Sequence, residues 1–204
     1  MSQSKMNRDE DMALRFRNKV GVVMGVANRY SIATAISHYL SNCGAEIAYS
    51  YQPCDSGKMA RRVSKALDHL KPKLVVPCDV RSDDAIHSFF DQVKTQYGHI
   101  DFLVHSIAYS PMEDLKKKTV EVSRAGFLHT MDTSVYSFLA CSHAASLLMN
   151  QGGAMITLTY IGGERVVPGY NVMGLAKAAL NCAVKYLSHD LSHQGIRANG
   201  SCSV

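Results

Sequence analysis

Long apolar runs are absent from this chain of 204 residues. Its longest apolar stretches are short and interrupted, whereas a membrane-spanning helix needs about 20 consecutive apolar residues. An apolar content of 47% with 19% charged residues is typical of a soluble globular protein and argues against both disorder and a fibre. We therefore expect no membrane partner, and a chain long enough to build one domain with a substantial core.

Several functional signatures are missing as well. The six cysteines never form a C-x-x-C pair and lie mostly in apolar segments, which indicates reduced thiols in a cytoplasmic protein. The net charge of +5 is spread without an Arg-rich stripe, so we expect no nucleic-acid partner, and the basic run 116–118 is either a solvated loop or a docking patch. His189 and His193 lack a third ligand at metal-site spacing, so no metal is expected. No G-x-S-x-G elbow indicates a hydrolase.

What the sequence does contain is a regular alternation of strand and helix patterns. With no internal repeat and no linker rich in Pro, Gly or Ser, this alternation predicts a single α/β domain with a doubly wound, parallel, Rossmann-like sheet. We expect residues 1–13 to be a mobile leader and residues 14–204 to form the domain. The predicted strands are 20–24, 45–51, 74–77, 102–105, 155–159 and 196 onward, and the predicted helices are 31–42, 57–70, 82–97, 123–149 and 170–193.

The turn after the first predicted strand has features of a dinucleotide-binding turn. Gly25 permits a tight turn, and Ala27 is small enough for a ligand to approach the backbone. Ser31 can bond a phosphate oxygen, and the following helix begins near Ile32 with its N–H groups free to face a pyrophosphate. A Gly and an Ala after a strand often serve packing alone. The position of this turn, at the sheet edge where carboxyl ends of parallel strands meet, is what favours the binding role.

The second and third predicted strands end in Gln52 and Asp79. Gln52 occupies the place of the acid that usually receives the adenosine ribose, and its amide can still bond hydroxyls. No Arg follows at once to neutralise a 2′-phosphate, which favours NADH over NADPH. Asp79 can accept a bond from the adenine amino group, although an Asp after a strand is also a common turn former or cap.

Tyr170 and Lys177 are spaced for hydride-transfer chemistry. Seven positions make almost two helical turns, so the two side chains can share one helix face about 10 Å apart along the axis. Lys177 would bind the hydroxyls of a nicotinamide ribose, and its charge would lower the pKa of the Tyr170 phenol, which would donate a proton or hydrogen bond to developing oxygen charge. Tyr and Lys also recur on ordinary amphipathic helices, and the spacing alone does not separate the two interpretations.

Four segments together resemble one enzyme family. They are Gly25-Val-Ala-Asn-Arg-Tyr-Ser-Ile, Cys78-Asp-Val, His105-Ser-Ile-Ala, and Tyr160-x9-Tyr170-x6-Lys177. Over about residues 14–199 the chain resembles the bacterial enoyl-[acyl-carrier-protein] reductases, which belong to the short-chain dehydrogenase/reductase superfamily. The Tyr-x6-Lys spacing is specific, because typical superfamily members carry Tyr-x3-Lys, and it disfavours a ketoacyl-type reductase.

The resemblance implies NADH-dependent reduction of the 2,3 double bond of an enoyl thioester on acyl carrier protein, in fatty-acid elongation. Tyr170 would stabilise the enolate oxygen, while Tyr160 would either contact the thioester or only pack in the pocket wall. The implied catalytic residues are Tyr160, Tyr170 and Lys177; the implied cofactor-binding residues are Gly25, Ala27, Ser31, Ile32, Gln52, Asp79, Val80, Ser106, Ile107, Ala108 and Lys177; and the implied substrate contacts are Ala108, Tyr160 and Tyr170.

The resemblance departs from the family at the end of the chain. After Gly195-Ile-Arg-Ala-Asn199 the sequence stops within five residues, whereas the family continues through helices over the acyl site and a last strand. We therefore expect a domain that lacks these elements and exposes apolar surface. Beside the reductase, an alternative stays open: a non-catalytic dinucleotide-binding or subunit-interaction module. The family also implies a homotetramer, assembled through the long helices 123–149 and 170–193.

Overall fold

Short runs of apolar and β-branched residues build the centre of the molecule. The computed structural model describes residues 15–203, so the predicted leader 1–13 lies outside the described residues. The strand Val20–Met24 is buried at four of its five positions, as expected for a strand with helices on both faces of its sheet. The strands are β1 (Val20–Met24), β2 (Glu46–Tyr51), β3 (Leu74–Pro77), β4 (Ile100–His105), β5 (Met149–Tyr160) and β6 (Arg197–Ser203).

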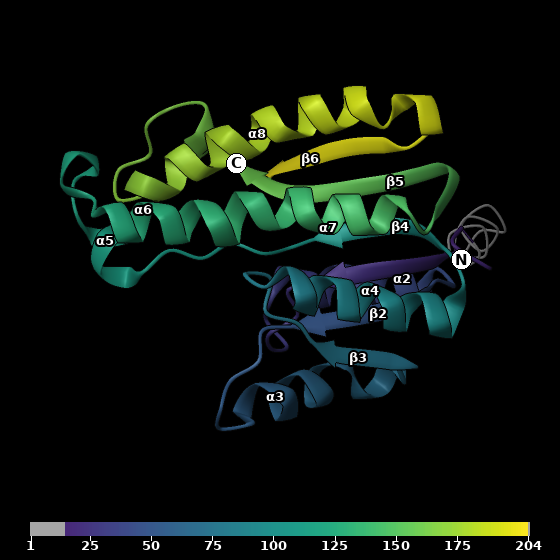
Figure 1. Ribbon diagram of the computed structural model, residues 1–204. Coiled ribbons are helices and arrows are strands. Elements are labelled where there is room, and N and C mark those ends of the chain that lie inside the picture. The colour runs from purple at the N-terminus through teal and green to yellow at the C-terminus, as the bar shows by residue number, and fades with distance from the viewer. Residues whose placement is uncertain (1–14, 204) are drawn as a thin grey trace, which may run out of the picture.

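These strands form one six-stranded sheet in the order β3-β2-β1-β4-β5-β6, and every pairing is parallel. The predicted doubly wound, Rossmann-like fold is thereby confirmed. The chain winds outward in one direction from β1 and in the other direction from β4, so the order reverses between these two neighbouring strands (Figure 1). Ligands of such sheets bind outside the carboxyl ends of the strands at this reversal point.

Helices cover both faces of the sheet (Figure 1). Alternate residues of β1 face opposite sides: Val22 and Met24 join a core with helices α4 and α7, whereas Val23 joins a core with α2 and α3. Burying each such side chain stabilises the fold by roughly 1.5–3 kcal/mol. The helices are α2 (Ile32–Asn42), α3 (Lys58–Leu67), α4 (Asp83–Tyr97), α5 (Met112–Lys116), α6 (Arg124–Met131), α7 (Ser137–Ser146) and α8 (Asn171–Asp190). Short 3-10 turns are η1 (Asp68–Leu70), η2 (Thr119–Glu121), η4 (Ile161–Gly163) and η5 (Ser192–Gln194), and η3 (Asp132–Tyr136) is a π-helix.

In the part of the chain that the structure describes, no helix combines the length and apolar character needed to cross a membrane.

Two predicted boundaries are wrong in the middle of the chain. The helix expected over 123–149 is interrupted by the π-helical turn η3 and ends at Ser146. The strand expected to begin at residue 155 begins at Met149, which pairs with Ile100 before the register shifts. Gly152, with φ of 91°, supplies a left-handed backbone conformation inside this strand. Gly152 and Gly153, a pair typical of loops, therefore form an irregularity within β5.

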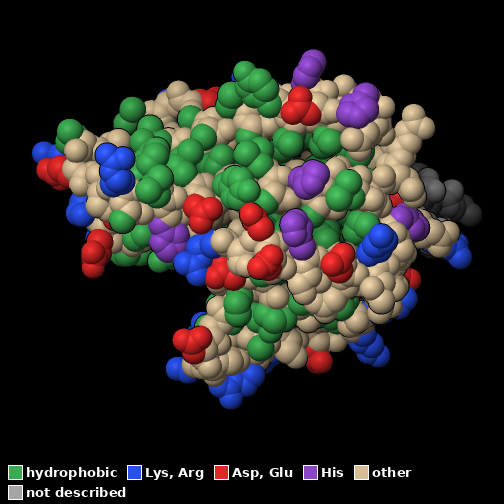
Figure 2. Space-filling view, in the orientation of Figure 1, with side chains coloured by type: hydrophobic (Ala, Val, Ile, Leu, Met, Phe, Trp, Pro, Cys, Tyr) green, Lys and Arg blue, Asp and Glu red, His purple; other side chains and the backbone are tan. Residues whose placement is uncertain are grey.

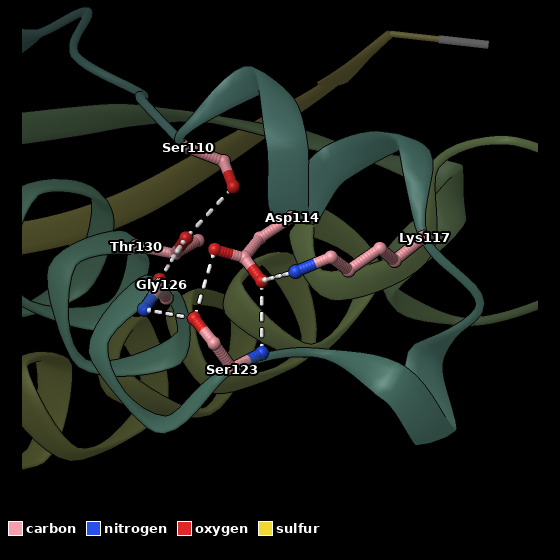
Figure 3. A network of polar contacts seen from close by, with 6 residues as sticks. All are labelled: Ser110, Asp114, Lys117, Ser123, Gly126 and Thr130. Atoms are coloured by element: carbon pink, nitrogen blue, oxygen red, sulfur yellow. Dashed lines mark hydrogen bonds and ion pairs between the residues drawn. The ribbon is translucent and has the colours of Figure 1, made fainter.

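A buried carboxylate joins α5 to the start of α6 (Figure 3). The Asp114 carboxylate accepts the Ser123 backbone N–H at 2.8 Å and the Ser123 hydroxyl at 2.9 Å, and Lys117 lies 3.3 Å from it. The Ser123 oxygen in turn accepts the Gly126 N–H at 2.9 Å, which caps α6. A Cβ at position 126 would lie 2.0 Å from the carboxylate, so only glycine permits this approach.

The Asp114 carboxylate should make stability depend on pH. The Ser123 N–H donates to it, with further help from the Ser123 hydroxyl and Lys117, and this holds its pKa below the usual range. Because the pKa is lower in the folded chain than in the unfolded chain, the stabilisation is complete above the ordinary pKa of about 3.9 and is lost as the pH falls below it. We expect Asp114→Asn to lower the melting temperature at pH 7, and the difference from the wild type to shrink on acidification from about pH 5 to pH 3. Thermal unfolding followed by circular dichroism measures this, with Asp91→Asn, an exposed carboxylate of α4, as the control. If the variant and the wild type differ in melting temperature by the same amount at pH 5 and at pH 3, the ionic role of Asp114 is contradicted.

Candidate active site

Two adjoining chambers lie along the carboxyl edge of the sheet. The Gln52 chamber holds about 360 Å³ and has Gln52, Arg81 and Thr133 in its walls. The Tyr170 chamber holds about 370 Å³ and is lined by Tyr160, Tyr170 and Lys177. Four residues are common to the walls of both chambers, so the two form one continuous groove across the reversal point of the sheet: Gly25, Ser106, Ile107 and Ala108.

The shared wall depends on the closeness of two strand ends. Gly25 follows β1 with φ of 90°, and a Cβ there would lie only 2.2 Å from the carbonyl oxygen of Ser106, which follows β4. The Ser106 N–H donates to the Met24 carbonyl at 3.2 Å. A side chain at position 25 would therefore both strain the backbone and push the ends of β1 and β4 apart.

The turn from β1 into α2 is held in shape by a serine. The Ser31 hydroxyl donates to the Asn28 carbonyl at 2.7 Å, and Thr34 donates to the same oxygen at 2.8 Å. Ser31 and Ile32 line the Tyr170 chamber, while Ala27 lines the Gln52 chamber, so this turn passes along both halves of the groove. The first N–H groups of a helix have no partner within the helix and carry partial positive charge, which suits a phosphate.

The adjacent ends of β2 and β3 form one wall of the Gln52 chamber. Arg81 donates to Asp79 through Nε at 3.0 Å and Nη2 at 2.5 Å, and lines the chamber beside Gln52. The Arg81 guanidinium is the main reason that the pKa of Asp79 falls to about 2, so this carboxylate is ionised at neutral pH. Both Asp79 oxygens already accept bonds from Arg81. The side chain of Val80 does not face the groove, because it is buried in the core against α4.

Two phenols and one ammonium meet in the Tyr170 chamber. The rings of Tyr160 and Tyr170 contact edge to face, with centroids 4.8 Å apart. Lys177 is 5% exposed, and its Nζ donates to the Leu158 carbonyl oxygen at 2.5 Å. Tyr170 and Lys177 therefore face one chamber, as predicted, although Tyr170 is the residue before α8 and not part of the helix.

The prediction that the Lys177 charge lowers the pKa of the Tyr170 phenol is wrong. Burial raises the pKa of Tyr170, and the neighbouring Tyr160 raises it further. Burial lowers the pKa of Lys177, because desolvation disfavours its charged form. Loss of water thus sets the direction of both pKa shifts, and the Lys177 ammonium is directed to a backbone carbonyl. Tyr170 consequently keeps its proton at neutral pH and is a hydrogen-bond donor.

Glycines allow the loop before α8 to lie against the helix. A Cβ at Gly162 would lie 2.6 Å from the Tyr170 ring, and one at Gly174 would lie 2.9 Å from the Gly162 carbonyl oxygen. Asn171, with φ of 41°, donates through its side chain to the Leu115 carbonyl of α5 at 2.8 Å. Tyr170 is therefore positioned from both sides, by the glycine loop and by the α5 segment that Asp114 holds in place.

His105, at the end of β4, supports the groove without entering it. It is fully buried, and burial together with the Lys177 charge lowers its pKa to about 3, so the ring is neutral. The Ser137 hydroxyl donates to the Thr133 carbonyl at 2.7 Å and accepts from His105 Nε2 at 2.9 Å, which assigns the ring proton to Nε2. His105 Nδ1 then accepts from Thr157 at 3.2 Å. This network links β4, β5 and α7 beneath the chambers.

One wall of the Gln52 chamber is made of residues that were not predicted from the sequence. Tyr109, His129 and Thr133 line it from the segment between β4 and α7, and Arg81 lines it from the end of β3. Arg81 carried a usable signal, because it lies two residues after Asp79 at a strand end. The other three carried none, since their positions depend on how a loop and a π-helical turn fold back. Among residues 15–203, His189 and His193 belong to no cluster of three side chains that could hold a metal ion.

The fold and this groove define a Rossmann-like α/β protein of the class that binds dinucleotides at the reversal point of the sheet. A family model described as Enoyl-(Acyl carrier protein) reductase matches residues 25–203. The chain is 42% identical over 186 residues to enoyl-[acyl-carrier-protein] reductase [NADH] of Nostoc sp., covering 91% of this chain and 72% of that protein. It is 41% identical to the [NADPH] enzyme of Staphylococcus aureus, with the same coverage. A crystal structure of the Anaplasma phagocytophilum reductase in complex with NAD superimposes with a TM-score of 0.88 at 40% identity, covering 92% of this chain and 71% of that one. The chain belongs to the enoyl-(acyl carrier protein) reductase family.

The contact between Gly25 and Ser106 can be tested by substitution. Gly57 provides a matched control, because it also has a positive φ, of 63°, but has nothing within 4 Å of an added Cβ. We expect Gly57→Ala to lower the free energy of unfolding by about 1–2 kcal/mol through backbone strain alone. Gly25→Ala should lower it by about 1–3 kcal/mol more, because the added methyl group also displaces the end of β4. Denaturant unfolding measures both values, and equal losses would show that β1 and β4 do not need this approach.

Proposed function

We propose that this chain catalyses NADH-dependent reduction of the 2,3 double bond of enoyl thioesters carried on acyl carrier protein, in fatty-acid biosynthesis. The observation that carries the proposal is the Tyr170 chamber, where a protonated phenol and a buried ammonium line the same cavity beside a dinucleotide-type turn. Membership in the enoyl-(acyl carrier protein) reductase family supports the same reaction. The relatives named for NADH, and the structural neighbour crystallised with NAD, support NADH as the cofactor.

The residues of the groove fit a nicotinamide dinucleotide. Gly25 lets the ends of β1 and β4 approach each other beside the groove, and the turn to α2 presents N–H groups suited to a pyrophosphate. Lys177 would hold ribose hydroxyls in the Tyr170 chamber, and Gln52 would bond the adenosine ribose in the other chamber. Gln52 presents no positive charge at the place where a 2′-phosphate would lie, which favours NADH over NADPH.

The chemistry follows from the state of the phenol. When bound, the cofactor supplies the hydride that adds to C3 of the double bond. Negative charge then develops on the thioester oxygen, and Tyr170 is placed to donate a hydrogen bond to it. The raised pKa of Tyr170 keeps that proton available, and C2 is protonated to complete the reduction. Tyr160 packs edge to face on Tyr170 and limits its ring orientations, while Ala108 and Tyr160 would contact the acyl thioester.

We also infer a cytoplasmic homo-oligomer, a tetramer by resemblance to the family. Hydrophobic side chains gather on the face formed by α6, η3 and α7 (Figure 2). Exposed among them are Leu128, Tyr136 and Leu147, at 58%, 48% and 73%. Apolar surface of this kind on neighbouring helices supports burial against further copies of the chain.

NADH binding and turnover together test the proposed function. We expect the protein, isolated from native expression, to bind NADH in a fluorescence titration. When a crotonyl thioester is added, it should oxidise the NADH, which is measured as a loss of absorbance at 340 nm. Binding without oxidation would instead support the alternative, a dinucleotide-binding or subunit-interaction module. No binding of any dinucleotide would reject both functions.

Tyr170→Phe tests the role of the phenol. Removing one preorganised oxyanion donor raises the barrier by about 3 kcal/mol, so kcat should fall by roughly 100-fold while NADH affinity changes little. Tyr186→Phe is the matched control, because Tyr186 lies on the same helix with 68% of its surface exposed. Steady-state kinetics with saturating NADH measure the effect, and full turnover of the Tyr170 variant would remove this residue from the mechanism.

A further inference from the structure

Two buried hydroxyl groups within residues 15–203 have no hydrogen-bond partner: those of Thr133 and Ser142. Both residues are more than nine-tenths buried, at 7% and 0% exposed. An unpaired buried polar group is unfavourable, and native proteins keep few of them. Thr133 differs from Ser142 in one respect, because it lines the Gln52 chamber.

The local backbone sets Thr133 apart from its neighbours. Thr130 donates to the Gly126 carbonyl at 2.7 Å, and Ser137 donates to the Thr133 carbonyl at 2.7 Å. Each of these hydroxyls is thus satisfied by the backbone one turn earlier, which is the usual arrangement for Ser and Thr in helices. Thr133 makes no such bond, and it lies in the π-helical turn η3. Single π-turns within helices occur frequently at functional sites.

The chamber beside Thr133 suits a ligand with an apolar body and polar edges. Met59, Ile107 and other apolar side chains provide most of its lining, and Gln52 offers an amide. The charge of Arg81 is balanced by its two side-chain bonds to Asp79. The chamber is therefore mostly apolar, with a few polar groups and no unbalanced charge, which matches a nucleoside better than a free phosphate.

We propose that Thr133 is a cofactor-binding residue whose hydroxyl turns into the Gln52 chamber and bonds the adenosine half of the dinucleotide. This inference rests on the proposed function. Threonine in a helix has two accessible χ1 rotamers, so rotation about Cα–Cβ can carry its hydroxyl from the buried position to another staggered position. The unliganded protein holds an unpaired hydroxyl, and the ligand satisfies it. Thr133 therefore lowers the stability of the empty protein while raising its affinity for the ligand.

These two effects have opposite signs, and this makes the proposal testable. Thr133→Val keeps the shape and removes the hydroxyl. We expect it to weaken binding of ADP-ribose and of NADH by about 5- to 10-fold, the effect of one hydrogen bond, while the melting temperature of the unliganded protein stays the same or rises. Thr133→Ser should bind both ligands like the wild type. Ser142→Ala, which removes the other unpaired hydroxyl, should leave both affinities unchanged.

Calorimetric titration with ADP-ribose and NADH, together with thermal unfolding of the ligand-free proteins, supplies the readouts. If Thr133→Val binds both ligands within twofold of the wild type, the inference is overturned while the proposed function stands. A fall in the melting temperature of the ligand-free Thr133→Val protein that accounts for its weaker binding would also overturn it, since that is the signature of a structural role. If the wild type binds neither ligand, the proposed function itself fails.

Discussion

The close approach of β1 and β4 at their carboxyl ends is the constraint on which the groove depends. The chain winds in opposite directions from these two strands, so their ends mark the reversal point where such sheets bind ligands. Gly25 and Ser106 meet there at a distance that leaves no room for a Cβ. The segment that starts at Ser106 thereby becomes a wall of both chambers, and one extended ligand can lie across them.

Burial shifts the pKa values of both Tyr170 and Lys177 in the Tyr170 chamber. Lys177 loses water and is directed to the Leu158 carbonyl, while Tyr170 loses water against Tyr160. Desolvation favours the neutral form of each group, so the phenol remains a donor. The glycines that bring the η4 loop against α8 are part of this environment, because they let the backbone exclude water from the phenols.

Both halves of the groove rely on the segment between β4 and α7. Asp114 joins α5 to the start of α6 (Figure 3). Asn171, in the first turn of α8, bonds the Leu115 carbonyl of α5. The same segment then enters the π-helical turn that places Thr133 beside the Gln52 chamber. One continuous stretch of chain, which connects β4 to α7, therefore positions both the phenol and the opposite chamber wall.

Local sequence patterns predict the fold class, the presence of six strands and the residues at their carboxyl ends. Apolar periodicity and strand ends are local properties, so they place Gly25, Gln52 and Tyr170 at one edge of the sheet. The start of β5 could not be placed, because Gly152 and Gly153 in a strand look like a loop until Ile100 is seen to pair with Met149. The pKa directions of Tyr170 and Lys177, and the presence of Arg81 and Thr133 in the groove, follow from tertiary packing. These depend on which surfaces exclude water and on how distant segments pack together, and neither can be read from residue types and spacing.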